Sequence, residues 1–222
     1  MYTVIAGPNG SGKTKLAKLE QLNGNLGLYI NPDSIARELP PGTANPDFAA
    51  RNITVERTRQ LLAAGESFAR ESAFSGKTIM RSIEEAKRTG YRVQVVFVAV
   101  EDVEEAIARV SVRVAQGGHD IPEEEQRRRF DLTIQNAATA ARSVDQLVLF
   151  DNPRNSDFQR VAQVEHGKVT MLAKNRPLWV DRVVIGLERQ PASLEPQETP
   201  PPRRSVPVRK PPGAEQDDEL GR

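Results

Sequence analysis

The sequence contains no cysteine among its 222 residues. This absence excludes disulfide scaffolds, cysteine-ligated metal sites and thiol catalysis, and it fits a reducing compartment. With two histidines, His119 and His166, a histidine-rich metal site is not expected. Net charge is also nearly absent, because 31 Lys and Arg oppose 30 Asp and Glu to give +1. The balance predicts no general attraction to nucleic acid or to a membrane surface.

Long apolar runs are missing as well. The most apolar stretch is Val93–Val100, and it includes Gln94, whereas a membrane-spanning helix needs about 20 apolar residues. The first residues lack the basic start and the long apolar segment of a signal peptide. We therefore expect a cytoplasmic protein without a membrane span.

The segment Arg189–Arg222 differs from the rest of the chain in composition. Half of the 16 prolines fall there, and few of its residues are apolar. Such a segment buries too little apolar surface to offset its ordering entropy. We predict a proline-rich disordered tail over 189–222, with docking of a proline-binding partner as an alternative, and a folded domain over 1–188.

Strand and helix patterns alternate through that domain, which predicts an α/β fold with a parallel sheet covered by helices on both faces. A terminal hairpin is expected over Val161–Leu172, turning at His166-Gly167. The other expected strands are Tyr2–Ala6, Leu28–Ile30, Ser67–Ser72, Arg92–Val100 and Gln146–Phe150. The expected helices are Ser11–Gln21, Pro46–Ala64, Thr78–Arg88, Val103–Ala115 and Glu123–Ala141.

A phosphate-binding loop follows the first strand. The residues match G-x-x-x-x-G-K-[ST] at every fixed position, with a strand before and a helix after, so a mere glycine-rich turn is disfavoured. Backbone N–H groups and the helix start would hold phosphates, Lys13 would reach the β and γ phosphates, and Thr14 would hold Mg²⁺. ATP and Mg²⁺ are therefore the expected ligands. The loop consists of Gly7, Pro8, Asn9, Gly10, Ser11, Gly12, Lys13 and Thr14.

A second Gly-Lys-Thr occurs at Gly76–Thr78, but Glu71 stands where the motif requires glycine. We interpret it as a helix start with Ser75 as the cap. The strand Leu147–Asp151 resembles a Walker B strand, although Asn152 replaces the glutamate typical of hydrolytic motors.

A kinase further needs a base near the acceptor hydroxyl. Asp33 follows the second strand, so it should lie beside the phosphate loop at the carboxyl edge of the sheet. The alternative is that Asp33 caps a short helix that begins there. The pattern alone leaves both open.

Arginines that neutralise phosphoryl charge are expected in a lid over about 113–130. Gly117, Gly118 and His119 interrupt two arginine-bearing helices. His119 is expected as a hinge or phosphate contact. The competing interpretations are a surface pair of Arg109 with Glu105, which we favour, and a solvated face in which the arginines of 127–129 oppose the glutamates of 123–125.

These motifs together resemble the zeta toxin family, over about residues 1–175. The resemblance rests on the phosphate loop, Asn31-Pro32-Asp33, Glu71–Gly76, the Arg113…Gly-Gly-His…Ile-Pro block and Phe150–Asn152. It implies an adenylate-kinase-like P-loop kinase that phosphorylates the 3′-hydroxyl of UDP-N-acetylglucosamine, and an antitoxin partner in several members. The short Gly-Gly-His lid is similar to the compact chromosomal type.

The resemblance also implies roles for single residues. Asp33 would be the general base, and Arg113 the first lid arginine, with Arg128 or a neighbour as the second. Glu71 would contact the substrate and Ser75 would position it. Asn152 would contact the adenine side of ATP.

Three other functions stay open from the residues. These are a P-loop kinase with another acceptor, such as a nucleotide, sugar, antibiotic or RNA end, an ATP-hydrolysing motor, and a nucleotide-dependent binding module. Nucleic acid is the less expected acceptor because the charge is balanced.

Overall fold

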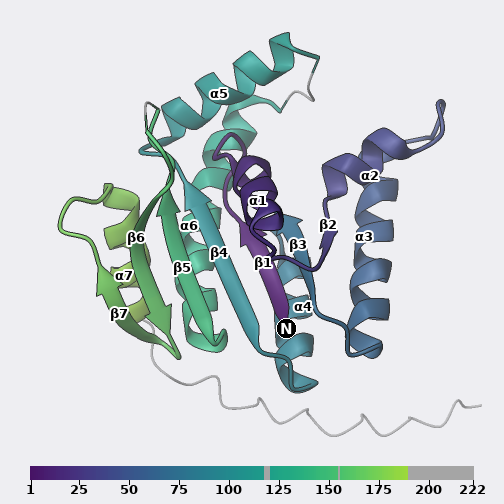
Figure 1. The fold of residues 1–222 in the computed structure, drawn as a ribbon. Coiled ribbons are helices and arrows are strands. Elements are labelled where there is room, and N and C mark those ends of the chain that lie inside the picture. Colours follow the sequence, from purple (N-terminus) through teal and green to yellow (C-terminus); the bar gives the residue numbers. More distant parts are fainter. Residues whose placement is uncertain (118–120, 155, 190–222) are drawn as a thin grey trace, which may run out of the picture. The chain divides into compact units, whose positions relative to one another are not determined.

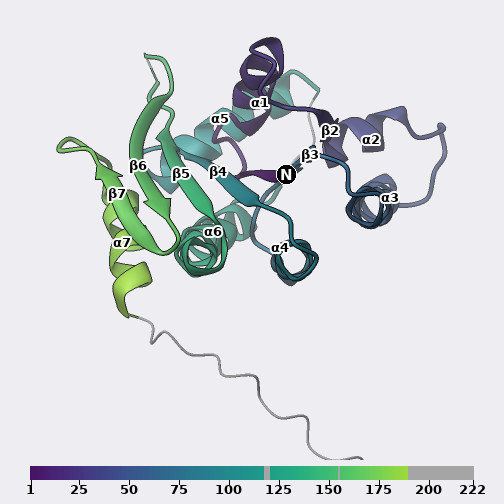
Figure 2. The same ribbon diagram turned by 60° about the horizontal axis from the view of Figure 1, so that its bottom comes forward.

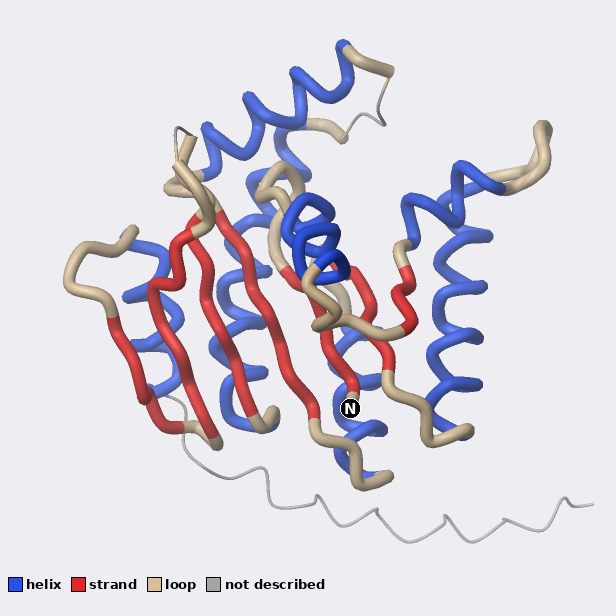
Figure 3. The backbone as a smooth tube through the Cα atoms, in the orientation of Figure 1, coloured by secondary structure: helices blue, strands red, loops and turns tan. Residues whose placement is uncertain are grey.

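The computed structural model describes residues 1–117, 121–154 and 156–189. Its strands form one sheet in the order β2-β3-β1-β4-β5-β6-β7, and Figure 3 shows them as a single layer among the helices. The first five strands in this order are parallel, and β6 and β7 are antiparallel additions at one edge. The strands are β1 Tyr2–Ala6, β2 Leu28–Ile30, β3 Phe68–Ser72, β4 Val93–Ala99, β5 Gln146–Asp151, β6 Gln159–Glu165 and β7 Lys168–Leu172.

Helices connect the parallel strands and lie on both faces of the sheet. Figure 2 shows α1 and α5 on one face and α4, α6 and α7 on the other, while α3 flanks β2 at the edge of the sheet in Figure 1. The predicted α/β architecture is confirmed. The helices are α1 Lys13–Leu22, α2 Pro32–Glu38, α3 Pro46–Ala63, α4 Lys77–Arg88, α5 Val103–Ala115, α6 Glu123–Ser143 and α7 Leu178–Arg189.

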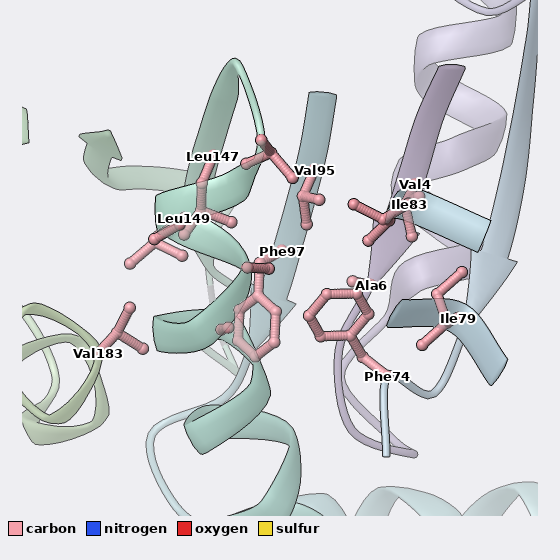
Figure 4. Packing of buried hydrophobic residues seen from close by; sticks show 14 of the residues in the cluster. Val4, Ala6, Phe74, Ile79, Ile83, Val95, Phe97, Leu147, Leu149 and Val183 are labelled. Atoms are coloured by element: carbon pink, nitrogen blue, oxygen red, sulfur yellow. The ribbon is translucent and has the colours of Figure 1, made fainter. Parts of the chain in front are cut away.

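The core lies between the sheet and the helices α4, α6 and α7. Side chains of β1, β4 and β5 meet Phe74, Ile79 and Ile83 there (Figure 4). The ring centroid of Phe97 lies 6.3 Å from that of Phe74 and 5.7 Å from that of Trp179. Every residue of β1 is buried, as expected of a central parallel strand covered on both faces.

The sequence patterns missed two helices. One is α7, which buries Trp179, Val180, Val183 and Leu187 against the rest of the core. It extends through Arg189, one residue into the segment assigned to the tail, and residues 190–222 lie outside the described residues. The other is α2, which the sequence patterns indicate only through the alternative in which Asp33 caps a short helix.

One capping prediction is wrong. Gly76 rather than Ser75 is the N-cap of α4, and no side chain caps that helix. The predicted hairpin is confirmed, and both His166 and Gly167 at its turn have positive φ, 47° and 75°. No helix in the described part of the chain combines the length and the apolarity that crossing a bilayer requires.

Candidate active site

The phosphate loop connects the end of β1 to the start of α1, at the carboxyl edge of the parallel strands (Figure 1). Gly12 has φ +93°, and a Cβ built there would lie 2.4 Å from Nδ2 of Asn152. That amide donates a 2.9 Å hydrogen bond to the Ser11 carbonyl. The Asn152 side chain therefore packs against the loop at Gly12, and only glycine fits at position 12.

Lys13 lies inside the curl of the loop. Its ammonium donates a 2.8 Å hydrogen bond to the Pro8 carbonyl, and the side chain is buried. Burial lowers the pKa of Lys13 because water is removed from the ammonium, and Glu71 and Asp33 partly oppose this shift. Phosphate oxygens would be stronger partners for this ammonium than a single carbonyl.

The loop borders a pocket of about 300 Å³ that brings most of the expected site together. Gly7 and Ser11 are buried, and Pro8 contributes its carbonyl to Lys13. The pocket would accommodate phosphates and a Mg²⁺ at Thr14, because donors and a hydroxyl converge on it. The lining residues are Asn9, Gly10, Gly12, Lys13, Thr14, Lys15, Pro32, Asp33, Glu71, Ser72, Ala73, Arg109 and Arg113.

Glu71 is the hydrogen-bonding centre of this pocket. The Thr14 hydroxyl donates to its two carboxylate oxygens at 3.1 and 3.0 Å, Tyr29 donates at 2.5 Å and the Asn31 amide donates at 3.0 Å. Glu71 is the fourth residue of β3, within the strand expected over Ser67–Ser72. Its side chain is buried, so three donors compensate a carboxylate that water does not reach.

The sequence interpretation missed Tyr29. Burial, followed by the neighbouring Glu71 carboxylate, raises the pKa of Tyr29 above its ordinary value. Its hydroxyl therefore remains a donor. A tyrosine two residues before the Asn-Pro-Asp motif was a usable signal, since alternate residues of a strand lie on the same face.

Asp33 lies in the first turn of α2, and its carboxylate is exposed toward the pocket. The capping alternative is wrong, because the N-cap is Asn31, whose side chain accepts from the N–H groups of Asp33 and Ser34. No hydrogen bond or ion pair reaches the Asp33 carboxylate from the described residues. It is therefore placed where an acceptor hydroxyl could approach it.

Arg109 and Arg113 both line the pocket from α5. The predicted pair of Arg109 with Glu105 is confirmed at 2.7 Å, but the same guanidinium also donates to the Asn152 carbonyl at 2.8 Å. The expectation that Arg109 forms only a surface ion pair is therefore wrong. Arg109 connects α5 to the residue that supports the phosphate loop.

The structure does not bring Arg128 to the pocket. Its guanidinium forms two 2.7 Å hydrogen bonds to Glu125 and is exposed. Arg129 also pairs with Glu125 but is half-buried, and exposed Arg127 pairs with Glu104 and Glu123. The solvated-face interpretation therefore fits Arg127 and Arg128 better than Arg129. Gly117 forms a turn after α5, with φ 85°, whereas Gly118 and His119 lie outside the described residues.

Two further expectations concern the ends of β3 and β5. Ser75 is half-buried and does not line the pocket. Asp151, the acid of the Walker B-like strand, lies on β5, which β4 separates from β1. It borders a separate pocket of about 830 Å³. Glu71 rather than Asp151 contacts Thr14, and Asn152 supports the loop from beneath.

Comparisons with known proteins show which family and which fold the chain resembles. The family model described as Zeta toxin matches residues 1–163, which include the phosphate loop, Asp33, Glu71, α5 and α6. An uncharacterized protein of Haemophilus influenzae is 31% identical over 121 residues, which are 53% of this chain and 84% of that protein.

Two solved structures show a similar fold. The AvrRxo1-ORF1:-ORF2 structure with ATP has a TM-score of 0.58 at 17% identity and covers 85% of this chain and 75% of that chain. The structure of the PezAT chromosomal toxin–antitoxin system of Streptococcus pneumoniae has a TM-score of 0.55 at 13% identity and covers 85% of each chain.

Proposed function

The chain belongs to the zeta toxin family, and on this premise we propose that it is a cytoplasmic, ATP- and Mg²⁺-dependent kinase. Its acceptor is a hydroxyl of a small sugar nucleotide, with UDP-N-acetylglucosamine as the first candidate. The observation that carries the proposal is the pocket itself, where the phosphate loop, the exposed carboxylate of Asp33 and the lid arginine Arg113 converge.

Each of these groups has a chemical task in phosphoryl transfer. The loop N–H groups and Lys13 hold the β and γ phosphates. Asp33 accepts the proton of the acceptor hydroxyl while that oxygen bonds the γ phosphorus and the bond from phosphorus to the bridging oxygen breaks, which releases ADP. Arg113 offsets the charge of the moving phosphoryl group. Bound Mg²⁺ would supply further charge neutralisation at the phosphates, held through Thr14.

The second arginine is assigned differently from the sequence expectation. Arg109 lines the pocket, and Arg128 is held by Glu125 outside it. We therefore assign Arg109 to the nucleotide side. Asn152 acts beneath the loop, since its amide is engaged by Ser11. Glu71 orients Thr14, and we assign it to the acceptor side because it lines the pocket together with Asp33.

Phosphorus NMR of the purified chain tests the proposal. With ATP, Mg²⁺ and UDP-N-acetylglucosamine, we expect a new phosphomonoester resonance that is absent without acceptor. Asp33→Asn should lower the transfer rate by about 10²-fold or more and leave ATP binding intact. Glu38→Gln is the matched control, because Glu38 is an exposed carboxylate at the other end of α2.

Other results would change the proposal. If ATP stays unchanged in the presence of UDP-N-acetylglucosamine, that compound is not the acceptor, and other hydroxyl compounds should be screened. Equal rates for Asp33→Asn and wild type would remove Asp33 from the mechanism.

An antitoxin partner is the second part of the proposal. It is motivated by family membership and by the PezAT structure, which is described as a toxin–antitoxin system. Induced expression in a bacterium should arrest growth for wild type and not for Asp33→Asn, and an antitoxin would bind the chain and restore growth. Equal growth of both cultures would contradict a toxic kinase.

A further inference from the structure

Resting on the kinase function above, we propose that Asn31 is a positioning residue that links Asp33 to Glu71 and the phosphate loop. Its amide is the connection between the element that carries the base and the carboxylate that holds Thr14.

Both ends of the Asn31 amide are used. Its Oδ1 accepts hydrogen bonds from the backbone N–H groups of Asp33 at 2.8 Å and Ser34 at 3.3 Å. Its Nδ2 donates to Glu71 at 3.0 Å and to the Tyr29 hydroxyl at 3.3 Å. The side chain is 5% exposed, so water does not replace these partners. The same side chain therefore starts α2 and holds it to β3.

The sheet register places these groups together. β2 and β3 are parallel, and Ile30 pairs with Arg70, so the next residues along the two strands are Asn31 and Glu71. Glu71 in turn accepts from Thr14 at the start of α1. A continuous path thus runs from Thr14, which would hold Mg²⁺, to the backbone of Asp33.

Asparagine is the residue that this position requires. Aspartate and serine are equally good helix caps, but aspartate cannot donate and would place a second carboxylate against Glu71. A serine at position 31 is too short to reach the Glu71 carboxylate. A cap alone would tolerate either substitution, whereas a link to Glu71 tolerates neither.

The same tripeptide occurs again at Asn45-Pro46-Asp47 and supplies a matched control. Asn45 caps α3 by accepting from the Phe48 N–H at 3.2 Å. It is exposed, and it does not border the phosphate pocket. Asn45→Asp makes the identical chemical change at an N-cap that has no link to the site.

The first experiment compares the kinetics of Asn31→Asp, Asn31→Ser and Asn45→Asp. We expect the two changes at Asn31 to lower kcat by about tenfold to a hundredfold, because small displacements of a base have costs of that order. KM for ATP should stay within about threefold of wild type, since the phosphate loop is intact. Asn45→Asp should behave as wild type. Wild-type kcat for Asn31→Asp and Asn31→Ser would show that Asn31 is a helix cap and would overturn the proposal.

The second experiment asks whether Asn31 acts through Asp33. In the Asp33→Asn background, Asn31→Asp should cause no further loss of kcat, because the group being positioned is already gone. An additional tenfold loss in that background would mean that Asn31 acts elsewhere, which also overturns the proposal.

The third experiment needs no phosphate transfer and so separates this inference from the kinase function. The double variant Asn31→Asp/Glu71→Gln exchanges amide and carboxylate across the same hydrogen bond and keeps the cap. Its melting temperature should exceed that of Asn31→Asp alone. A double variant that is less stable than both single variants would refute the link, whether or not the wild type transfers phosphate.

Discussion

Replacing Gly12 by alanine tests how the phosphate loop is held in its curl. The new Cβ would lie 2.4 Å from the Asn152 amide nitrogen, at a backbone φ of +93°. The left-handed backbone costs alanine about 1–2 kcal/mol. Displacing Asn152 would also leave the buried Ser11 carbonyl without its partner, which costs about 1–3 kcal/mol. We expect Gly12→Ala to lower the free energy of unfolding by about 2–5 kcal/mol.

Gly90→Ala separates the two contributions. Gly90 follows the C-cap of α4 with φ +85°, and a Cβ there would meet no atom within 4 Å. This control should lose only the backbone term of about 1–2 kcal/mol. Urea denaturation gives both values, and calorimetry with Mg²⁺ and ADP should show an affinity loss of about tenfold or more for Gly12→Ala alone.

The results for Gly12→Ala and Gly90→Ala together test whether Asn152 holds the phosphate loop. Equal destabilisation by the two substitutions, together with unchanged ADP affinity in Gly12→Ala, would show that Asn152 does not hold the loop. The loop would then depend on its own glycines and on the start of α1.

Three further predictions follow from buried or paired groups. Lys13→Met should abolish phosphate transfer. It should not lower the melting temperature of the free protein, because burying the Lys13 ammonium, whose pKa is lowered, removes it from water at a cost in folding free energy. Trp179→Ala should cost about 3–5 kcal/mol in urea denaturation, and Leu178→Ala, at an 80% exposed neighbour, should be nearly neutral. Despite burial, which raises it, the pKa of Asp145 is held below its ordinary value by Lys87 and the Val93 N–H. The ionised Asp145 carboxylate should therefore stabilise the fold above about pH 4, and this contribution should be lost as the pH falls further. In Asp145→Asn, the melting temperature should depend less on pH in this range.

Local patterns predicted the regular elements of the domain closely. The bounds of β1, β2 and α5 agree with their predictions residue for residue, since apolar spacing and helix-end signals are short-range properties. The phosphate loop was recognisable because its chemistry lies within eight consecutive residues, Gly7–Thr14. The helix α7 escaped prediction, although Trp179, Val180, Val183 and Leu187 follow the helical period, because the segment stands between two turn-rich stretches.

The arginines show where local reasoning ends. Five candidates lie on two helices, and helical periodicity alone does not say which face meets the phosphate loop. The structure turns Arg109 and Arg113 toward the pocket and pairs Arg128 with Glu125. Which arginines line the pocket depends on how α5 packs over the carboxyl edge of the sheet.

The two Asn-Pro-Asp tripeptides also separate what local sequence determines from what tertiary structure determines. Both begin a helix, with asparagine as the N-cap and proline at the first position, because capping is a property of neighbouring residues. The same local sequence therefore leads to the same kind of helix start, although Asn31 has an extended backbone (φ −119°) and Asn45 a left-handed one (φ 48°). Only the pairing of β2 with β3 brings Asn31, and not Asn45, against Glu71. Hydrogen bonds between residues 40 positions apart in the sequence depend on strand register, which is decided when the whole sheet assembles.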